Sequence, residues 1–219
     1  PDGGEAEKSG NGIREFAKYL HDVGYVDKKS FELKTIGGKA KVTFLDESAK
    51  FIKVDMGIPV FTSKDIPTNF KESEAINQTI VVDGNSYMVS CVSVGNPHCV
   101  ILSDAVSKTI ANSVGPKIEH HNMFPNKINV QFLKVIDRSN IQIEIWERGA
   151  GYTLASGTSS CAAASVAHKL DLVDDTVSVH MPGGIITISF APNGHIFMTG
   201  EVTAVSYGYF SNELLNQKI

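Results

Sequence analysis

The chain has 219 residues, a formal net charge of −4 and 20% charged residues, a composition typical of globular proteins. This length is enough for two modest lobes with cores of their own, and the charge gives no basic surface for nucleic acid. No apolar run approaches the roughly 20 residues that span a bilayer, and no signal peptide is visible, so we expect neither membrane contact nor secretion. Three cysteines without a framework spacing fit a reducing cytoplasm, and we expect them to be small buried residues.

A segment of serine, glycine and asparagine precedes the first predicted helix. Residues 9–12 are followed by apolar residues at helical spacing, which predict a helix from about Gly12 to His21: Ile13, Phe16, Ala17 and Leu20. The unpaired N–H groups and partial positive charge of a helix N-terminus can bind a carboxylate. Such helix starts are more often plain caps than binding sites, so this segment alone does not identify a site.

Alternating apolar runs predict strands after this helix. Residues 34–57 are expected to form a hairpin, and Gly57-Ile58-Pro59 to mark a boundary between two lobes. A second hairpin is expected at residues 80–89. One more helix is expected between Ser103 and Gly115, where three apolar residues are spaced by four: Val106, Ile110 and Val114.

The segment Gly95-Asn96-Pro97-His98 has two interpretations. It is a good turn initiator, and a turn alone would explain it. Alternatively, Asn96 offers a donor and an acceptor to a ligand, and His98, titrating near neutrality, assists a base. Asn129, in a strand predicted at residues 128–132, is likewise either a satisfied polar residue or a ligand contact. The cysteines and histidines have no spacing typical of a metal site, so we expect none.

Residues 147–158 are the most informative stretch of the chain. A strand predicted at residues 141–146 leads to Glu147 and Arg148, whose opposite charges suit a ligand that carries both an ammonium and a carboxylate. A surface ion pair is the plainer explanation of these two residues. Glycines at 149 and 151 permit turns that other residues avoid. Ser156-Gly157-Thr158 then offers N-caps for a helix that begins near Cys161.

The two Ser-Gly segments belong to an internal repeat. Ser9 and Ser156 are each followed, at nearly equal separations, by a helix and then by a glycine pair, Gly37-Gly38 or Gly183-Gly184. Each glycine pair precedes two alternating apolar runs joined by a turn. Two copies suggest two related lobes whose helix N-termini face one cleft. Two equivalent groups on opposite sides of a substrate suit racemisation or epimerisation, because a proton leaves one face of a carbon and another arrives on the opposite face.

Four segments, spread in order over most of the chain, together resemble the diaminopimelate epimerase family: residues 9–14, 95–100, 147–158 and 181–184. The family consists of cofactor-independent amino-acid epimerases of lysine and cell-wall biosynthesis. The resemblance implies an α+β fold with two pseudo-symmetric lobes, each a mixed, barrel-like sheet around a central helix. We expect residues 1–57 and 202–219 in the first lobe and 58–201 in the second. The family carries a strand-rich segment before the position of Pro1, so we expect the first lobe to be incomplete at its N-terminus.

The resemblance also implies a site. The α-carbon of an amino acid would lie between Ser9 and Ser156, which occupy the two catalytic positions. Substrate binding is assigned to Gly10, Asn11, Asn96, Asn129, Glu147, Arg148, Gly157 and Thr158, with His98 as an auxiliary residue. Glu147 and Arg148 would bind the distal ammonium and carboxylate of diaminopimelate. No cofactor is expected, the partner is a small amino acid, and a homodimer is a common assembly in the family.

The chain departs from the family pattern at these same positions. The family has a cysteine at each helix start, one as thiolate base and the other as thiol acid, where this chain has Ser9 and Ser156. A thiol has a pKa of about 8.5, lower still at a helix N-terminus, whereas a serine hydroxyl is a far weaker acid that acts as a base only with help. Tyr152 stands where the family usually has glutamate, and Glu15 where it often has cysteine.

These departures leave several functions open. The first expectation is pyridoxal-phosphate-independent epimerisation of diaminopimelate by two-base proton transfer. The alternatives are a racemase of another amino acid such as histidine, and a Cys-to-Ser variant or relative that binds an amino acid without turnover. A further alternative keeps the fold but changes the reaction, as proline racemase-like dehydratases and phenazine-pathway isomerases do.

Overall fold

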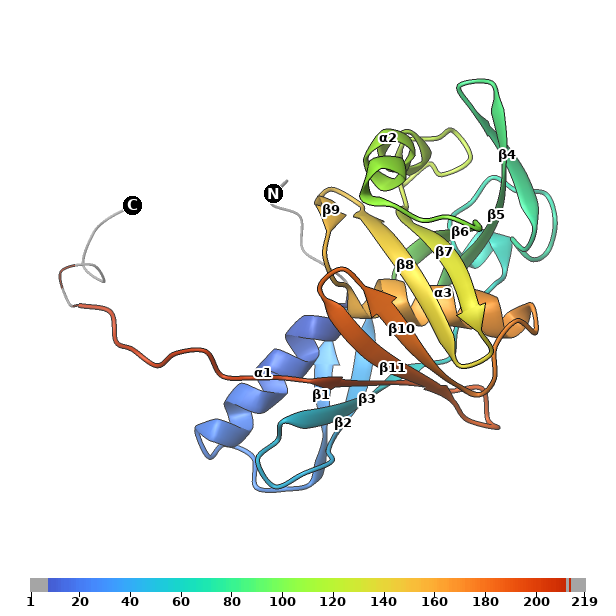
Figure 1. The fold of residues 1–219 in the computed structure, drawn as a ribbon. Helices are drawn as coiled ribbons and strands as arrows, with labels where there is room; N and C mark the ends of the chain where they lie inside the picture. Colours follow the sequence, from blue (N-terminus) through green and yellow to red (C-terminus); the bar gives the residue numbers. More distant parts are fainter. Residues whose placement is uncertain (1–7, 212, 214–219) are drawn as a thin grey trace.

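The computed structural model describes residues 8–211 and 213, which form a mixed α+β fold with few helices and many strands (Figure 1). The helices are α1 (Gly10–Asp22), α2 (Lys108–Glu119) and α3 (Gly157–Lys169), with a 3-10 turn η1 (Ser63–Asp65). The strands are β1 (Ser30–Thr35), β2 (Gly38–Phe44), β3 (Phe51–Gly57), β4 (Gln78–Val82), β5 (Asn85–Ser93), β6 (Pro97–Leu102), β7 (Asn129–Asp137), β8 (Asn140–Glu147), β9 (Gly151–Thr153), β10 (Thr176–Met181), β11 (Gly184–Phe190) and β12 (Ile196–Glu201). The expected α+β class is therefore confirmed.

The strands form one continuous mixed sheet. Its hydrogen-bonded order is β1-β2-β3-β12-β11-β10-β8-β7-β6-β5-β4, and β9 pairs with β8. Most neighbours are antiparallel, while β8 with β10 and β6 with β7 are parallel. A parallel pair needs a long crossover between its strands. Helix α2 supplies the crossover between β6 and β7, and α3 lies in the one between β8 and β10.

The internal repeat is present in the structure. Helix α1 is followed by β1, β2 and β3, and helix α3 by β10, β11 and β12, with the same antiparallel pairing in each copy. The last strands of the two copies, β3 and β12, pair antiparallel, with Val54 opposite Met198. Each copy has one strand more than the sequence predicted, β1 or β10, placed before its glycine pair. The predicted assignment of residue ranges to two lobes stays a prediction.

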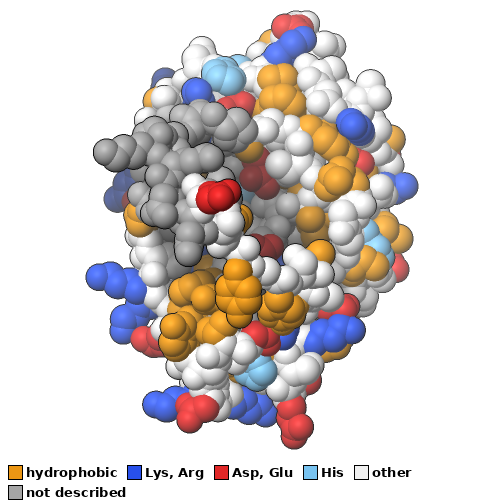
Figure 2. Space-filling view, turned by 90° about the vertical axis from the view of Figure 1, so that its left-hand side faces the viewer, with side chains coloured by type: hydrophobic (Ala, Val, Ile, Leu, Met, Phe, Trp, Pro, Cys, Tyr) orange, Lys and Arg blue, Asp and Glu red, His pale blue; other side chains and the backbone are white. Residues whose placement is uncertain are grey.

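The two helices of the repeat differ in how they are covered. In α3 every residue from Gly157 to Ala167 is buried, and the run of alanines lets the surrounding strands approach closely. Helix α1 buries only one face, and Phe16 and Tyr19 are about half exposed, at 50% and 54%. Figure 2 faces the side on which α1 and residues 202–211 lie, and it shows hydrophobic side chains gathered there.

The hydrophobic core has two clusters, one around α3 and one between α2 and the sheet. The first cluster contains Cys161, and the second contains Cys91 and Cys99. All three thiols are free and buried, as predicted. Among the described residues, no helix has the length and apolar character needed to cross a membrane.

Helix α2 begins and ends later than predicted. It runs over Lys108–Glu119 rather than from Ser103 to Gly115, because the Ser107 hydroxyl accepts a hydrogen bond from the Ile110 N–H and so starts the helix there. Pro116 lies inside the last turn without ending it. Helix α1 at Gly10–Asp22 agrees with its predicted range.

Residues 202–211 follow β12 as a chain without helix or strand (Figure 1). The Val202 N–H donates to the Lys50 carbonyl at 2.8 Å, and the Tyr207 hydroxyl lies 3.5 Å from Asp22 Oδ2, beside the end of α1. The assignment of residues 202–219 to the first lobe stays a prediction. Of these residues, 212 and 214–219 lie outside the described part of the chain.

Candidate active site

The N-termini of α1 and α3 meet at two glycines. A Cβ atom added to Gly10 would lie 3.0 Å from the Gly157 Cα, and one added to Gly157 would lie 3.0 Å from the Gly10 Cα. The Met198 side chain of β12 packs against both glycines: its Sδ would lie 3.1 Å from a Cβ atom at Gly10 and 2.7 Å from one at Gly157. The two helices can approach this closely only because neither first residue has a side chain. The two helix N-termini that the sequence singled out therefore lie together.

Each helix is capped by the serine of its Ser-Gly pair. Ser9 Oγ accepts a hydrogen bond from the Gly12 N–H at 3.1 Å, and Ser156 Oγ accepts one from the Ser159 N–H at 3.4 Å. An α-helix leaves its first N–H groups without intrahelical acceptors. In both helices the serine hydroxyl accepts a hydrogen bond from the N–H of the third helical residue. The N–H groups of the first two helical residues are not bonded to this hydroxyl, and they belong to Gly10 and Asn11 in α1 and to Gly157 and Thr158 in α3. These are the four residues expected to bind a carboxylate.

Two buried cations lie beside these helix starts. Lys8 Nζ donates to the Met56 carbonyl at 2.8 Å, and Arg14 donates to the Gly10 carbonyl at 3.4 Å and to Asn11 Oδ1 at 3.1 Å. Burial lowers the pKa of both groups, and the nearby Cys161 partly opposes this. Their charge adds to the positive ends of the helices and favours an anionic group there. The sequence analysis did not single out either cation, because an isolated lysine or arginine carries no pattern.

The turn between β8 and β9 carries Glu147 and Arg148. Gly149 has φ +73°, which lets the chain reverse within a few residues. Glu147 Oε1 accepts a hydrogen bond from the Thr153 hydroxyl at 3.0 Å. The Arg148 N–H donates to Asn129 Oδ1 at 3.0 Å. The two charged residues are thus held on a tight, side-chain-braced turn just before the start of α3.

Asn129 is the first residue of β7 and bridges two parts of the site. Its Oδ1 accepts from the Arg148 N–H, and its Nδ2 donates to the Pro97 carbonyl at 2.8 Å. The side chain is buried, so these bonds hold the Arg148 turn against the start of β6. The Asn129 side chain is thus a buried polar group with both ends hydrogen-bonded, as one of its two interpretations predicted. A contact of Asn129 with substrate stays a prediction.

His98 is fully buried in β6, and its ring lies 3.0 Å, Nε2 to Oδ1, from Asn96. Burial lowers the pKa of His98 to about 3; Gln131 opposes this shift, and the Arg148 guanidinium adds to it. The expectation that His98 titrates near neutrality is therefore wrong, because a charged imidazole would be stripped of water at this position. His98 and Asn96 do lie together, on the strand that Asn129 ties to the Arg148 turn.

Within the described part of the chain, no strong base contacts the hydroxyl of Ser9 or Ser156. Among residues 8–211 and 213, the hydrogen bonds that reach them come from backbone N–H groups and from the Thr158 hydroxyl, 3.5 Å from Ser156 Oγ. Neither a carboxylate nor an imidazole is part of this set. His98, the expected auxiliary residue, instead bonds to Asn96, and the Glu147 carboxylate bonds to Thr153.

Tyr152 lies in β9, and its side chain contacts Glu144 and Lys108. Its hydroxyl donates to the buried Glu144 at 2.7 Å, and the Lys108 ammonium lies 5.2 Å from the centre of its ring. Burial and the Glu144 carboxylate together raise the pKa of Tyr152 to about 12, so the hydroxyl remains a donor. Tyr152 thus connects β9 with Glu144 of β8 and Lys108 of α2.

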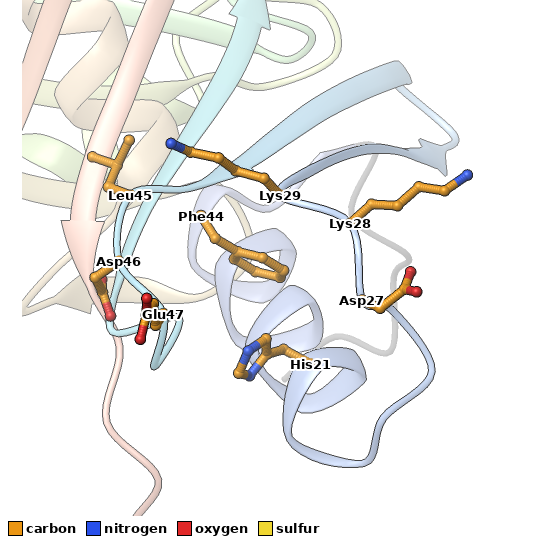
Figure 3. A pocket seen from close by; sticks show the side chains of 8 residues that line it. All are labelled: His21, Asp27, Lys28, Lys29, Phe44, Leu45, Asp46 and Glu47. Carbon is orange, nitrogen blue, oxygen red and sulfur yellow. The ribbon is translucent and has the colours of Figure 1, made fainter.

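A separate hollow of about 460 Å³ lies at the other end of α1, between His21, Phe44 and two charged loops (Figure 3). Its Asp46 carboxylate accepts from the backbone N–H groups of Ser48, Lys50 and Phe51, which with the Ser48 hydroxyl lowers its pKa to about 2. Asp46 thus stabilises its own turn. Because α1 is 13 residues long, roughly 20 Å separate this hollow from Ser9.

Comparisons with known proteins show the family of the chain. The sequence model described as diaminopimelate epimerase matches residues 1–62 and 90–205. The chain belongs to the diaminopimelate epimerase family. Diaminopimelate epimerase 2 of Nostoc sp. is 50% identical over 98% of this chain and 75% of its own length. The diaminopimelate epimerase of Alkaliphilus metalliredigens is 38% identical over 98% of this chain and 76% of its own length.

Solved structures with the same fold belong to other epimerases and racemases. A probable proline racemase from Agrobacterium radiobacter has a TM-score of 0.69 at 13% identity and covers 96% of this chain and 69% of its own. A hydroxyproline epimerase from Agrobacterium vitis has a TM-score of 0.65 at 13% identity and covers 89% of this chain and 64% of its own. At these identities the likeness shows the fold alone.

Proposed function

We propose that this protein is a cofactor-independent amino-acid epimerase whose substrate is diaminopimelate. Membership of the diaminopimelate epimerase family and the 50% identity to a relative of that name support the reaction and the substrate. The structural observation that carries the proposal is the contact between Gly10 and Gly157, which brings the N-termini of the two repeat helices together. A reaction that moves a proton between the two faces of one carbon needs such paired positions.

In this proposal the α-carboxylate of the substrate binds to the N–H groups at the starts of α1 and α3. The positive helix ends and the buried cations Lys8 and Arg14 favour that charge. The distal ammonium and carboxylate bind to Glu147 and Arg148. The α-carbon then lies between Ser9 and Ser156, with Asn96 and Asn129 completing the binding shell.

The chemical step depends on the two serine hydroxyls. One of them takes the α-proton while the other gives a proton to the opposite face, and the carbanion is stabilised next to the bound carboxylate by the helix N-termini. A hydroxyl needs a neighbouring base to do this. Glu147 is the helper in this proposal, because the fully buried His98 has a pKa of only about 3. Glu147 would have to leave its present partner, Thr153, to reach a serine hydroxyl.

A second candidate is an amino-acid-binding protein without turnover. The observation that favours it is the bonding of both serine hydroxyls: they cap their helices, and no base contacts them among the described residues. Both candidates use the same ligand and the same binding residues. They differ only in whether the α-proton leaves.

Two further features belong to this proposal. The protein acts in the cytoplasm on a small amino acid, and it assembles as a homodimer. Light scattering would test the assembly, since a dimer has about twice the 23.7 kDa mass of the chain.

The experiment that tests the proposal restores the expected thiols. The Ser9→Cys/Ser156→Cys double variant should convert LL-diaminopimelate to the meso form at least about a hundredfold faster than the chain itself, because a thiolate at a helix N-terminus is accessible near neutral pH. Each single variant is the matched control and should gain far less, since two groups are needed. A double variant that neither binds nor converts diaminopimelate would overturn the proposal.

A further inference from the structure

A buried carboxylate at the end of α2 contacts the turn that carries Glu147 and Arg148. Glu119 is only 4% exposed. Its Oε2 accepts a hydrogen bond from the Trp146 indole N–H at 2.7 Å, and its Oε1 accepts one from the Gly149 backbone N–H at 2.9 Å. Each carboxylate oxygen therefore has its own donor, one near the end of β8 and one in the turn that follows it.

The two donors flank the charged pair. Trp146 immediately precedes Glu147, and Gly149 immediately follows Arg148. Glu119 thus fixes the two ends of a four-residue segment, while Asn129 Oδ1 holds its middle through the Arg148 N–H. A segment fixed at both ends and in the middle retains few backbone conformations, so the directions of its two charged side chains are set in advance.

Helix α2 packs closely against β8 at Gly115 and Trp146. A Cβ atom at Gly115 would lie 2.7 Å from both Cβ and Cγ of Trp146, so the helix approaches the indole only because residue 115 has no side chain. This approach brings the last residue of α2 over the turn. Holding the helix in place needs apolar contact alone, which Ile118 and its buried neighbours supply. A buried carboxylate costs desolvation, and hydrogen bonds to its two oxygens offset that cost only while the turn keeps its shape.

We propose that Glu119 is a positioning residue for the distal end of the substrate: it fixes the turn so that Glu147 and Arg148 point into the site. The inference rests on the proposed function, because it takes Glu147 and Arg148 as the groups that bind the distal charges. Glu119 itself does not touch the ligand and acts through the turn.

The test uses Glu119→Gln, with Glu201→Gln as the matched control. A glutamine keeps one acceptor but turns an NH₂ group towards an N–H donor, so one of the two bonds is lost. Glu201 lies on the surface, half exposed and paired with Lys50. Calorimetric titration with meso-diaminopimelate should give a Kd about tenfold higher for Glu119→Gln than for the chain, and an unchanged Kd for Glu201→Gln. The emission of Trp146, the single tryptophan, should also change in Glu119→Gln only.

Trp146→Phe is the second variant, for the case that Glu119→Gln does not fold. It removes one donor and leaves the Gly149 bond, so Kd should rise by a smaller factor, about threefold. An unchanged Kd in every folded variant would overturn the inference. If the unaltered chain binds no diaminopimelate, the proposed function fails, and the positioning role is judged instead from amide exchange at Gly149. Exchange there should be slow in the chain and fast in Glu119→Gln, and equally fast exchange in both would overturn it.

Discussion

The contact between the two helix starts makes Gly157→Ala the most informative substitution. The new methyl carbon would lie 2.7 Å from Met198 Sδ, 3.0 Å from the Gly10 Cα and 3.3 Å from the Gly10 carbonyl carbon. Two of these three atoms are backbone, so no side-chain rotation can relieve the overlap. The helices must separate by a few tenths of an ångström or the strand that carries Met198 must shift.

The expected cost combines two terms of opposite sign. An alanine in place of a helical glycine gains up to about 1 kcal/mol of helix propensity. Overpacking a close contact typically costs about 1–3 kcal/mol, and a clash with backbone lies at or above the upper end. The net destabilisation is then about 2 kcal/mol, which for a chain of this size lowers Tm by about 4–8 °C. Ligand affinity should fall as well, because both carboxylate-binding helix ends move.

Urea unfolding and calorimetric titration with diaminopimelate would measure both effects. Gly12→Ala is the matched control, because its methyl carbon would meet only the Ser9 side chain, at 3.2 Å from Oγ and 3.4 Å from Cβ. That variant should stay within about 0.5 kcal/mol of the chain. If Gly157→Ala is as stable as Gly12→Ala and binds ligand equally well, the two helix starts do not form one site.

Three further predictions concern buried polar groups. The pKa of His98 is about 3 in the folded protein and 6.5 for an ordinary imidazole, so between pH 3 and pH 6.5 the unfolded chain binds more protons than the folded one. The free energy of unfolding should therefore decrease as pH falls below 6.5, by about 3 kcal/mol at pH 4. Urea unfolding should show this slope for the chain and not for His98→Gln, and equal slopes would refute it. All three thiols are buried, and burial raises the pKa of Cys161 to about 12 and the pKa of Cys99 well above its ordinary value. At pH 8 Ellman's reagent should therefore label no cysteine in the folded protein and all three in urea. Tyr152→Phe leaves the buried Glu144 without its donor and should cost about 1–3 kcal/mol by urea unfolding while leaving the Kd for diaminopimelate unchanged; a raised Kd would mean that Tyr152 faces the ligand.

The features that local sequence signals encode were predictable. The serine caps of α1 and α3, the glycine pairs and the hairpins after them follow from capping and turn chemistry, and the structure has them. Helix α3 begins at Gly157, earlier than the predicted start near Cys161, because Ser156 is its N-cap. The start of α2 was less predictable, because Val106, Ile110 and Val114 pack together although only the last two are helical. Apolar spacing alone does not separate a helix from the loop that leads into it.

The features that depend on which residues meet in space were not predictable. The repeat predicted that the two helix starts face one cleft, but not the direct contact between Gly10 and Gly157. Nothing near Glu119 in the sequence indicates its bonds to Trp146 and Gly149. The environment of His98 was misjudged for the same reason, since burial in the interior sheet, and not its neighbours in the sequence, determines its pKa. Tyr152 adjoins the site in the sequence, yet its hydroxyl bonds to the buried Glu144 of β8.

The most direct test of the central claim is deuterium incorporation at the α-carbon of diaminopimelate in D₂O, followed by NMR, with histidine and glutamate in parallel samples. We expect exchange with diaminopimelate above the rate of a sample without protein, because a two-base site removes the α-proton and returns one from solvent. Binding of diaminopimelate without any exchange would contradict the epimerase account and leave the protein as an amino-acid receptor.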